Sequence, residues 1–338
     1  MTSTAARTIS VVLATFNGQA FLERQLASLA GQTHLPYELI VSDDGSTDRT
    51  HDIVEAFRKA APFPVFHRRN AAAQGFRDNF LGAARLANGD WIAFCDQDDV
   101  WRHDKLEICA AHMRVPGVTQ IAHQATLIDG EDRTIGAFDQ GITQGGTRPQ
   151  LAYDIWGTFW GFSMLVDRRV LELVNPDERF VDYIDPRHLI AHDRWAFFLA
   201  QTLGNTVEIA QPLAGYRQHG NNLFGKTDGR SRKKSVATLK AENAVYVQAT
   251  RRMLEIVEAL PPDCERRFPA FDRERAVTTY RRALRQLEKR GAIYAGGRAS
   301  ALVRSLAMLA CGDYRNAQDN SLRWRSFMRD MSMSLARR

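Results

Sequence analysis

The first hundred residues alternate between short apolar runs and amphipathic segments. Strands are predicted at the apolar runs, which are bounded by turn-forming residues: residues 9–14, 38–41, 65–67 and 91–95. Helices are predicted between them, where apolar residues recur every three to four positions: residues 21–29, 53–57 and 76–87. Gly31 is expected to end the first helix, and Ser46 or Thr47 to cap the second. This alternation predicts an α/β fold with a mainly parallel sheet flanked by helices.

The pattern changes at about residue 225. A further strand is predicted at residues 118–128, before that change. Beyond it, residues 226–240 are polar and basic and are interpreted as a linker, and long helical patterns follow at 245–260 and 274–290. We therefore expect an α/β domain over residues 1–225 and a helical basic region over residues 226–338.

Charge divides the chain at the same place. Residues 1–225 carry 20 Lys and Arg against 27 Asp and Glu, and residues 226–338 carry 25 against 12. The resulting charges of −7 and +13 make up the net charge of +6, so an acidic body is joined to a basic tail. The tail is either a solvated helical face or a surface attracted to an anionic membrane. Residues 301–310 and 322–328 mix Arg with apolar side chains, as interfacial helices do.

Composition and the N-terminus indicate a location. No apolar run approaches the roughly 18 residues that cross a bilayer, and the first ten residues lack the apolar part of a secretory signal. The chain is therefore expected in the cytoplasm, with peripheral contact at the inner face of the membrane. Nucleic acid is not expected as a partner, because the acidic body would repel it. The cysteines form no CxxC pair and are expected to be reduced core thiols: Cys95, Cys109, Cys264 and Cys311.

Acidic residues follow two of the predicted strands. Asp43 and Asp44 come after the second strand, and Asp96, Asp98 and Asp99 after the fourth. Ligands of parallel sheets bind beyond the carboxyl ends of the strands, so both groups are expected at one edge. Asp96 and Asp98 point the same way in an extended chain, which suits Mg²⁺ or Mn²⁺ and, through the cation, a diphosphate. The alternative is that these residues cap a following helix, but it leaves the second acidic group unexplained.

Six motifs occur in order over residues 7–225. They are VVLATFN, VSDDGSTD, Asn70–Gly75 with Asn79, DQDDVW, the segment His192–Trp195, and Tyr216–Asn222. This arrangement resembles the family-2 inverting glycosyltransferases of the GT-A fold, and DQDDVW has a form common among rhamnosyltransferases of that family. The resemblance implies a GT-A type, Rossmann-like domain that uses a nucleoside-diphosphate sugar as donor and a glycan or lipid-linked hydroxyl as acceptor. The basic tail carries no motif of the family.

The resemblance also implies a role for individual residues. The residues implied in donor binding are Thr15, Asn17, Asp43, Asp44, Asn79, Asp96 and Asp99. Those implied in the reaction are Asp98 and His219 as metal ligands, Asp193 as the catalytic base, and Trp160 with Gly161 on the acceptor side. His123 departs from the family, which often has an acidic residue near that point, and this leaves the acceptor open.

Each of these roles has a simpler alternative. Asp193 could cap a helix, His219 could be an ordinary loop histidine, and the rings around Trp160 could belong to the core. At the level of function, the alternatives are a non-catalytic module that only binds nucleotide sugar and a nucleotide-dependent oxidoreductase. The oxidoreductase is disfavoured, because no G-x-G-x-x-G follows the first strand.

Overall fold

A mixed sheet forms the centre of the protein. The computed structural model describes residues 7–220, 235–315 and 321–335. The strand order is β3-β2-β1-β4-β9-β6-β10-β5, with β7 beside β6 and β8 beside β10. The first four strands along the chain are mutually parallel: β1 (Ile9–Thr15), β2 (Glu38–Asp43), β3 (Val65–Arg69) and β4 (Trp91–Asp96). These strands coincide with the four predicted apolar runs, so the α/β prediction is confirmed.

The second half of the sheet contains the antiparallel pairs. Its strands are β5 (Val100–Trp101), β6 (Val118–Ile128), β7 (Thr134–Phe138), β8 (Gly146–Arg148), β9 (Met164–Asp167) and β10 (Asn205–Arg217). β9 lies antiparallel between β4 and β6, and β10 runs parallel to β6. The predicted strand at 118–128 is confirmed as β6.

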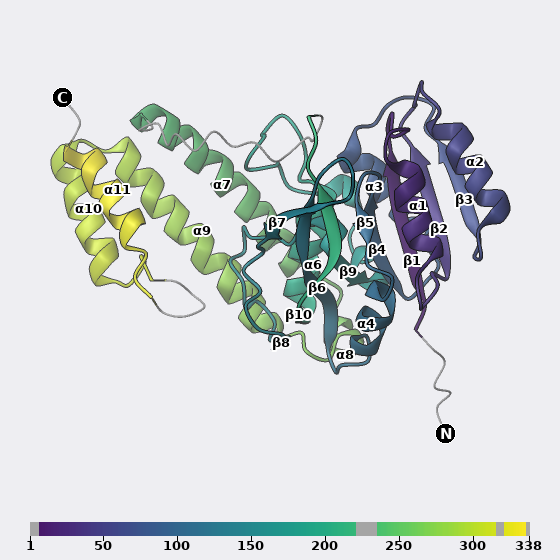
Figure 1. The fold of residues 1–338 in the computed structure, drawn as a ribbon. Coiled ribbons are helices and arrows are strands. Elements are labelled where there is room, and N and C mark those ends of the chain that lie inside the picture. Colours follow the sequence, from purple (N-terminus) through teal and green to yellow (C-terminus); the bar gives the residue numbers. More distant parts are fainter. Residues whose placement is uncertain (1–6, 221–234, 316–320, 336–338) are drawn as a thin grey trace.

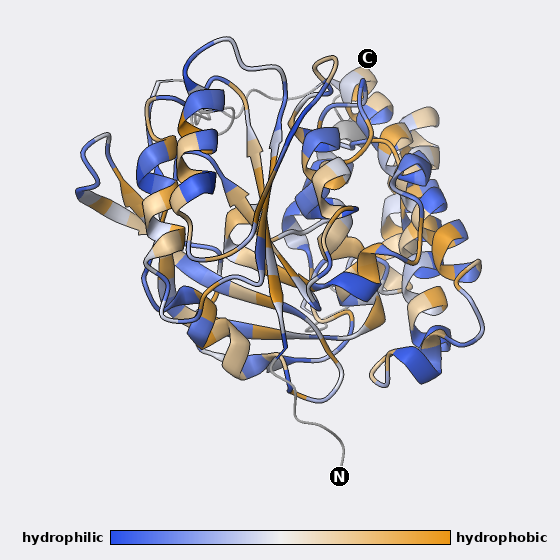
Figure 2. Cartoon of the chain, turned by 90° about the vertical axis from the view of Figure 1, so that its right-hand side faces the viewer, coloured by the Kyte–Doolittle hydropathy of each residue, from blue (hydrophilic) through white to orange (hydrophobic). Residues whose placement is uncertain are grey.

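Helices cover both faces of the sheet (Figure 1). Alternate residues of a strand face opposite sides; on β1, Val11 and Leu13 join one apolar cluster and Val12 joins the other. The first cluster packs against α1 (Leu22–Ala30), α2 (Thr50–Ala60) and α4 (Lys105–His112). The second packs against α3 (Phe76–Ala84) and α6 (His192–Leu203). In Figure 2 the central strands are largely hydrophobic, whereas the surrounding helices carry residues of both kinds.

Short helical turns complete the α/β part. They are η1 (Gly161–Ser163), α5 (Arg168–Leu171) and η2 (Pro176–Glu178). η1 leads directly into β9, so the aromatic segment before it is held against the carboxyl end of β4.

The C-terminal helices pack partly against the core of the sheet and partly against one another. They are α7 (Val236–Glu258), α8 (Cys264–Arg267), α9 (Arg273–Ala295), α10 (Arg298–Ala310) and α11 (Trp324–Leu335). Met253 of α7 and Tyr280 of α9 belong to the same buried cluster as Trp195 of α6, and the Thr202 and Tyr280 hydroxyls lie 2.7 Å apart. The far ends of α7 and α9 form a separate small core with α10 and α11 (Figure 1). The boundary at residue 225 remains a prediction, and the apolar core continues beyond it.

Several local predictions need correction. The cap of α2 is Arg49, because Ser46 and Thr47 are engaged with Asp43 and Asn17 instead. Cys311 is exposed, whereas Cys95, Cys109 and Cys264 are buried. Most of the predicted linker lies outside the described residues, and its last part belongs to α7.

Truncating Phe268, which is 2% exposed in the shared core, tests whether the C-terminal helices stabilise the sheet. We expect Phe268→Ala to lower the free energy of unfolding by about 3–5 kcal/mol, because a large cavity is left among well-packed side chains. Urea denaturation followed by tryptophan fluorescence measures this change. The matched control is Phe66→Ala on β3, where the ring is 54% exposed. A cooperative transition of the sheet that is unchanged in Phe268→Ala would show that the helices fold separately.

Candidate functional site

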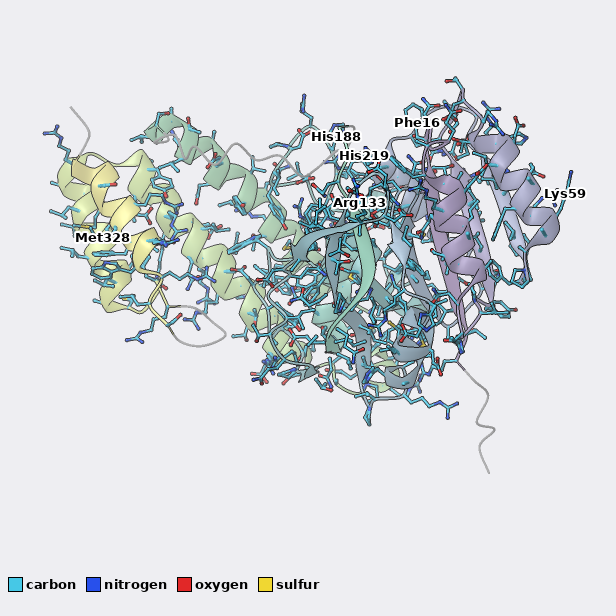
Figure 3. The ribbon with its side chains drawn as sticks, viewed as in Figure 1. Phe16, Lys59, Arg133, His188, His219 and Met328 are labelled. Atoms are coloured by element: carbon cyan, nitrogen blue, oxygen red, sulfur yellow. The ribbon has the colours of Figure 1, made fainter. Side chains whose placement is uncertain are left out.

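The carboxyl ends of β2 and β4 meet on either side of β1. Thr15 at the end of β1 pairs in register with Asp43, and Ala14 pairs with Asp96. The two acidic groups therefore lie at one edge of the sheet, as predicted. Figure 3 shows Phe16, which follows β1, and His219, which follows β10, near the same edge of the molecule.

Asp43 is buried beneath polar neighbours. Its carboxylate accepts hydrogen bonds from Thr15 Oγ1 at 3.0 Å, from Ser46 N at 3.0 Å and from Ser46 Oγ. The Nε of Arg69 lies 3.7 Å from Asp43 Oδ2, with the Arg69 side chain half exposed. Arg69 also donates to Ser46 O at 2.7 Å, so its guanidinium is held beside the buried carboxylate.

Asn17 and Gln97 hold the turn after β1 in place. Asn17 has a left-handed backbone, with φ of 48°, and its side-chain oxygen accepts a hydrogen bond from Thr47 N at 2.9 Å. Gln97 makes a reciprocal pair with the backbone of Phe16, accepting from its N–H at 2.9 Å and donating to its carbonyl at 3.1 Å. The loop after β1 is thus tied to the loops after β2 and β4.

Asp44 and Asn79 organise the loop between β3 and α3. Asp44 accepts from Asn70 Nδ2 at 2.9 Å and from the backbone N–H groups of Gln74 and Gly75 at 2.8 Å. Asn79 accepts from Asn70 Nδ2 and donates to Ser42 O. Asp44 is 5% and Asn79 2% exposed, so these side chains hold the loop through buried hydrogen bonds.

The DQDD segment concentrates negative charge. Asp96 is partly exposed, and desolvation, followed by the charges of Asp98 and Asp193, raises the pKa of Asp96 to about 7. Asp99 is buried; its Oδ1 accepts from Arg217 N at 3.1 Å, and its Oδ2 has no hydrogen-bond partner within the described residues. Burial raises the pKa of Asp99 well above its usual range. The capping alternative is wrong, because α4 begins at Lys105 with Asp104 as its cap residue.

His219 and Arg217 approach this segment from the end of β10. His219 Nε2 lies 2.7 Å from Asp98 Oδ2, and both side chains are about one-fifth exposed. Arg217 is buried, donates from Nε to Asp98 O at 2.6 Å, and lies over the ring of Phe21 at 4.6 Å. Its guanidinium also pairs with Asp132. These contacts place the two predicted metal ligands side by side.

Lys105 places a cation behind the acidic segment. Its Nζ donates to Phe162 O at 2.6 Å and lies 3.5 Å from the centre of the Trp101 ring. Burial lowers the pKa of Lys105 to about 8, while the charges of nearby groups, including Asp99 and Asp96, act in the opposite direction. Lys105 thus connects Trp101 of β5 with the segment that carries Gly161.

Asp193 enters the site from the first turn of α6. The helix begins at His192 with Ala191 as its cap residue, so the alternative that Asp193 is the N-cap is wrong. His192 is buried and stacks on Phe80 with ring centres 3.9 Å apart, which fixes the start of the helix against the sheet. Asp193 remains partly exposed and close enough to Asp96 to affect its pKa.

Gly161 allows this close approach. A Cβ on Gly161 would lie 2.7 Å from His192 Nε2 and 3.6 Å from the Cβ of Asp193. Trp160 beside it is partly exposed and packs against Phe138 and Tyr216, with ring centres 5.5 and 5.8 Å away. The Trp160 ring therefore belongs in part to the core, while one side remains at the surface. His123 is fully buried within β6 and presents no surface to a ligand.

The sequence alone did not single out Arg69, Gln97, Lys105 or Arg217. Gln97 lies inside the DQDD motif, which is a positional signal, whereas Arg69 lies two residues beyond the strand predicted at 65–67. Arg217 lies inside the motif Tyr216–Asn222, but the sequence did not show that it or Lys105 is buried, because a lone Lys or Arg is usually solvated.

No group of three His, Cys, Asp or Glu side chains in the described parts of the chain could hold a metal ion by itself. Likewise, none of the described helices is both long and apolar enough to cross a membrane.

The strand order and the acidic edge define an α/β protein of GT-A type. Residues 10–173 match the family described as Glycosyl transferase family 2. An uncharacterized glycosyltransferase of Nostoc sp. (strain PCC 7120) is 32% identical over 228 residues, 63% of this chain and 66% of that protein. The dTDP-rhamnosyl transferase RfbG of Shigella flexneri is 35% identical over 100 residues, 28% of this chain and 34% of that protein. The chain thus carries a glycosyl transferase family 2 domain, and it spans just under two thirds of the first relative and one third of the second.

A solved structure extends the similarity in fold to the C-terminal helices. S. aureus TarS 1-349 in complex with UDP superposes with a TM-score of 0.56 at 14% identity, over 97% of this chain and 90% of that chain. At this identity the likeness concerns the fold alone.

Replacing Lys105 tests how the site is held together. We expect Lys105→Met to lower the free energy of unfolding by about 1–3 kcal/mol, because the buried carbonyl of Phe162 loses its donor. Chemical denaturation measures the loss, and Lys59→Met on the exposed end of α2 is the control. Equal stability of the two variants would mean that Lys105 contributes no net free energy.

Proposed function

We propose that this protein is a metal-dependent inverting glycosyltransferase. It would move a sugar from a nucleoside-diphosphate sugar to a hydroxyl of a glycan or glycolipid acceptor in cell-surface polysaccharide synthesis. The observation that carries the proposal is the convergence of Asp193 from α6 with Asp96, Asp98 and His219 from the ends of β4 and β10.

The donor would lie across the edge formed by β1, β2 and β4. Thr15 and Asp43 line the innermost part, where an acidic acceptor suits the N3–H of a pyrimidine base. Arg69 would move aside or stack on the base, because its half-exposed side chain lies beside Asp43. Asp96 would bind the ribose, and Asp99 would keep the loop in place through Arg217.

The residues fit a hard divalent cation that takes its remaining ligands from the donor. Asp98 and His219 provide one carboxylate and one imidazole at 2.7 Å from each other, and they are partly exposed. Mg²⁺ and Mn²⁺ commonly combine few protein ligands with phosphate oxygens and water. When bound there, the cation would neutralise charge that develops on the leaving diphosphate.

Asp193 is the proposed general base. An acceptor hydroxyl would attack the anomeric carbon from the face opposite the diphosphate, while Asp193 takes the hydroxyl proton. The new glycosidic bond forms as the bond to the diphosphate breaks, so the configuration inverts and no covalent enzyme intermediate is needed. Gly161 lets the acceptor-side segment approach this carboxylate, and the partly exposed ring of Trp160 offers a surface for a sugar ring.

Two finer assignments concern the transferred sugar and the location of the enzyme. Rhamnose as the transferred sugar is supported by the form of DQDDVW and by one relative that matches 28% of this chain. A cytoplasmic location would give the enzyme access to nucleotide sugars. The alternative of a non-catalytic nucleotide-sugar-binding module would not require Asp193 beside the acidic edge.

The first test removes the proposed general base, Asp193. Asp193→Ala is expected to lower kcat for donor hydrolysis or transfer about 10²–10⁴-fold, because the attacking hydroxyl keeps its proton. The dissociation constant for the nucleoside diphosphate should stay within about twofold, since Asp193 lies on the acceptor side. Asp177→Ala, at an exposed carboxylate, is the control. A wild-type chain that binds donors without releasing nucleoside diphosphate would instead favour the binding module.

The second test concerns the cation. We expect UDP or dTDP to raise the melting temperature with Mn²⁺ and to lose most of that effect after EDTA treatment, because the ligand stabilises the folded state by mass action. His219→Ala should need at least tenfold more Mn²⁺ for the same shift. His188→Ala is a matched control, since Figure 3 shows His188 near the same edge and its ring is half exposed. Identical metal dependence in both variants would exclude His219 as a ligand.

A further inference from the structure

The long helix α9 carries a basic groove on its surface. Its 23 residues contain seven Lys and Arg and two Glu. The groove is lined by Thr278, Arg281, Arg282, Arg285, Lys289 and Asp313. Arg281 pairs with Glu258, and Lys289 with Asp313, each at 2.6 Å. No ion pair within the described residues joins Arg282 or Arg285 to an acid, so the groove retains positive charge for an anionic ligand.

The neighbouring helices α10 and α11 leave large apolar side chains in water. Val303 is 65% and Leu306 47% exposed on α10, and Trp324 is 52% and Met328 49% exposed on α11. The inner face of α10 is formed by Ala301, Ser305 and Met308, so Val303 and Leu306 are not needed to hold the helices together. Exposed apolar side chains gathered on adjacent helices indicate a binding surface.

Positive charge accompanies these apolar residues. The described residues between 298 and 332 include six Arg and two Asp. Both Asp residues are engaged, Asp313 with Lys289 and the buried Asp330 with Arg290 at 2.9 Å. Arg304 and Arg325 are exposed beside the apolar side chains. The surface thus offers cationic and apolar groups together.

We propose that α9, α10 and α11 form a docking surface for an anionic lipid bilayer. Arg282 and Arg285 would bind headgroup phosphates in the groove, and Val303, Leu306, Trp324 and Met328 would enter the interfacial layer. Both kinds of contact are available at a bilayer surface at the same time. A second copy of the chain would bring the same positive charge to the contact, and nucleic acid would leave the apolar side chains unused.

The location of this surface fits peripheral attachment. Figure 3 places Met328 at the end of the molecule opposite Lys59, with His219 between them. The docking surface therefore lies away from the end formed by α2 and β3, and a bound bilayer would leave that end free (Figure 1).

The test is flotation of the full chain with vesicles, without any donor. The chain should float with vesicles of phosphatidylcholine and phosphatidylglycerol and not with phosphatidylcholine alone. Arg282→Glu combined with Arg285→Glu should lower binding at least tenfold, because each reversal replaces attraction by repulsion. Val303→Ser combined with Leu306→Ser should also weaken binding severalfold and leave a stronger dependence on salt. Trp324→Ser provides an independent apolar variant on α11.

Matched controls lie at the other end of the molecule. Arg58→Glu with Lys59→Glu reverses the same number of charges on α2, and Phe66→Ser removes an exposed ring from β3. Both should float as the unmodified chain does. Equal binding of the α9 variant and the α2 variant would overturn the proposal. So would self-association without vesicles that Val303→Ser with Leu306→Ser abolishes, since the surface would then belong to a second copy. Because flotation requires no turnover, these outcomes are independent of the catalytic assignment.

Discussion

Mutual repulsion among the carboxylates at one edge of the sheet is the constraint on which the site depends. Asp96, Asp98, Asp99 and Asp193 meet there because parallel strands end together and α6 starts beside them. The protein holds them with neighbours that are themselves fixed: Arg217 binds the backbone of this segment, and Lys105 lies behind it. These contacts leave Asp96 and Asp98 partly exposed, so a cation and its diphosphate ligand would complete the balance of charge.

In the proposed mechanism, the groups that bind the donor and the base that acts on the acceptor lie on different segments of the chain. Hydrogen bonds of Asn17, Gln97 and Asp44 tie the loops after β1, β2, β3 and β4 together at the edge where the proposed donor would lie. The proposed acceptor side lies on later segments, where Gly161 packs closely against His192 and Asp193, and His192 stacks on Phe80. The reacting groups of the proposed transfer therefore come from different parts of the chain, and their alignment relies on the packing of α6 against the sheet.

The C-terminal helices contribute in two ways. Their near halves complete the core around α6 through residues such as Met253 and Tyr280, and so support the helix that carries Asp193. Their far ends have a small core of their own and expose basic and apolar side chains. A single set of helices thus links the stability of the site to the surface that would bring it to a membrane.

The parallel sheet and the acidic edge could be predicted from the sequence, because both depend on residues that are close together in the chain. The apolar runs at β1, β2 and β4 and the acids that follow them determined the parallel sheet and its acidic edge. The tertiary structure alone decided that Asp44 and Asn79 are buried, that Lys105 and Arg217 are buried, and that the core crosses residue 225. Burial and hydrogen-bond partners arise from segments distant in the chain, so no local pattern encodes them.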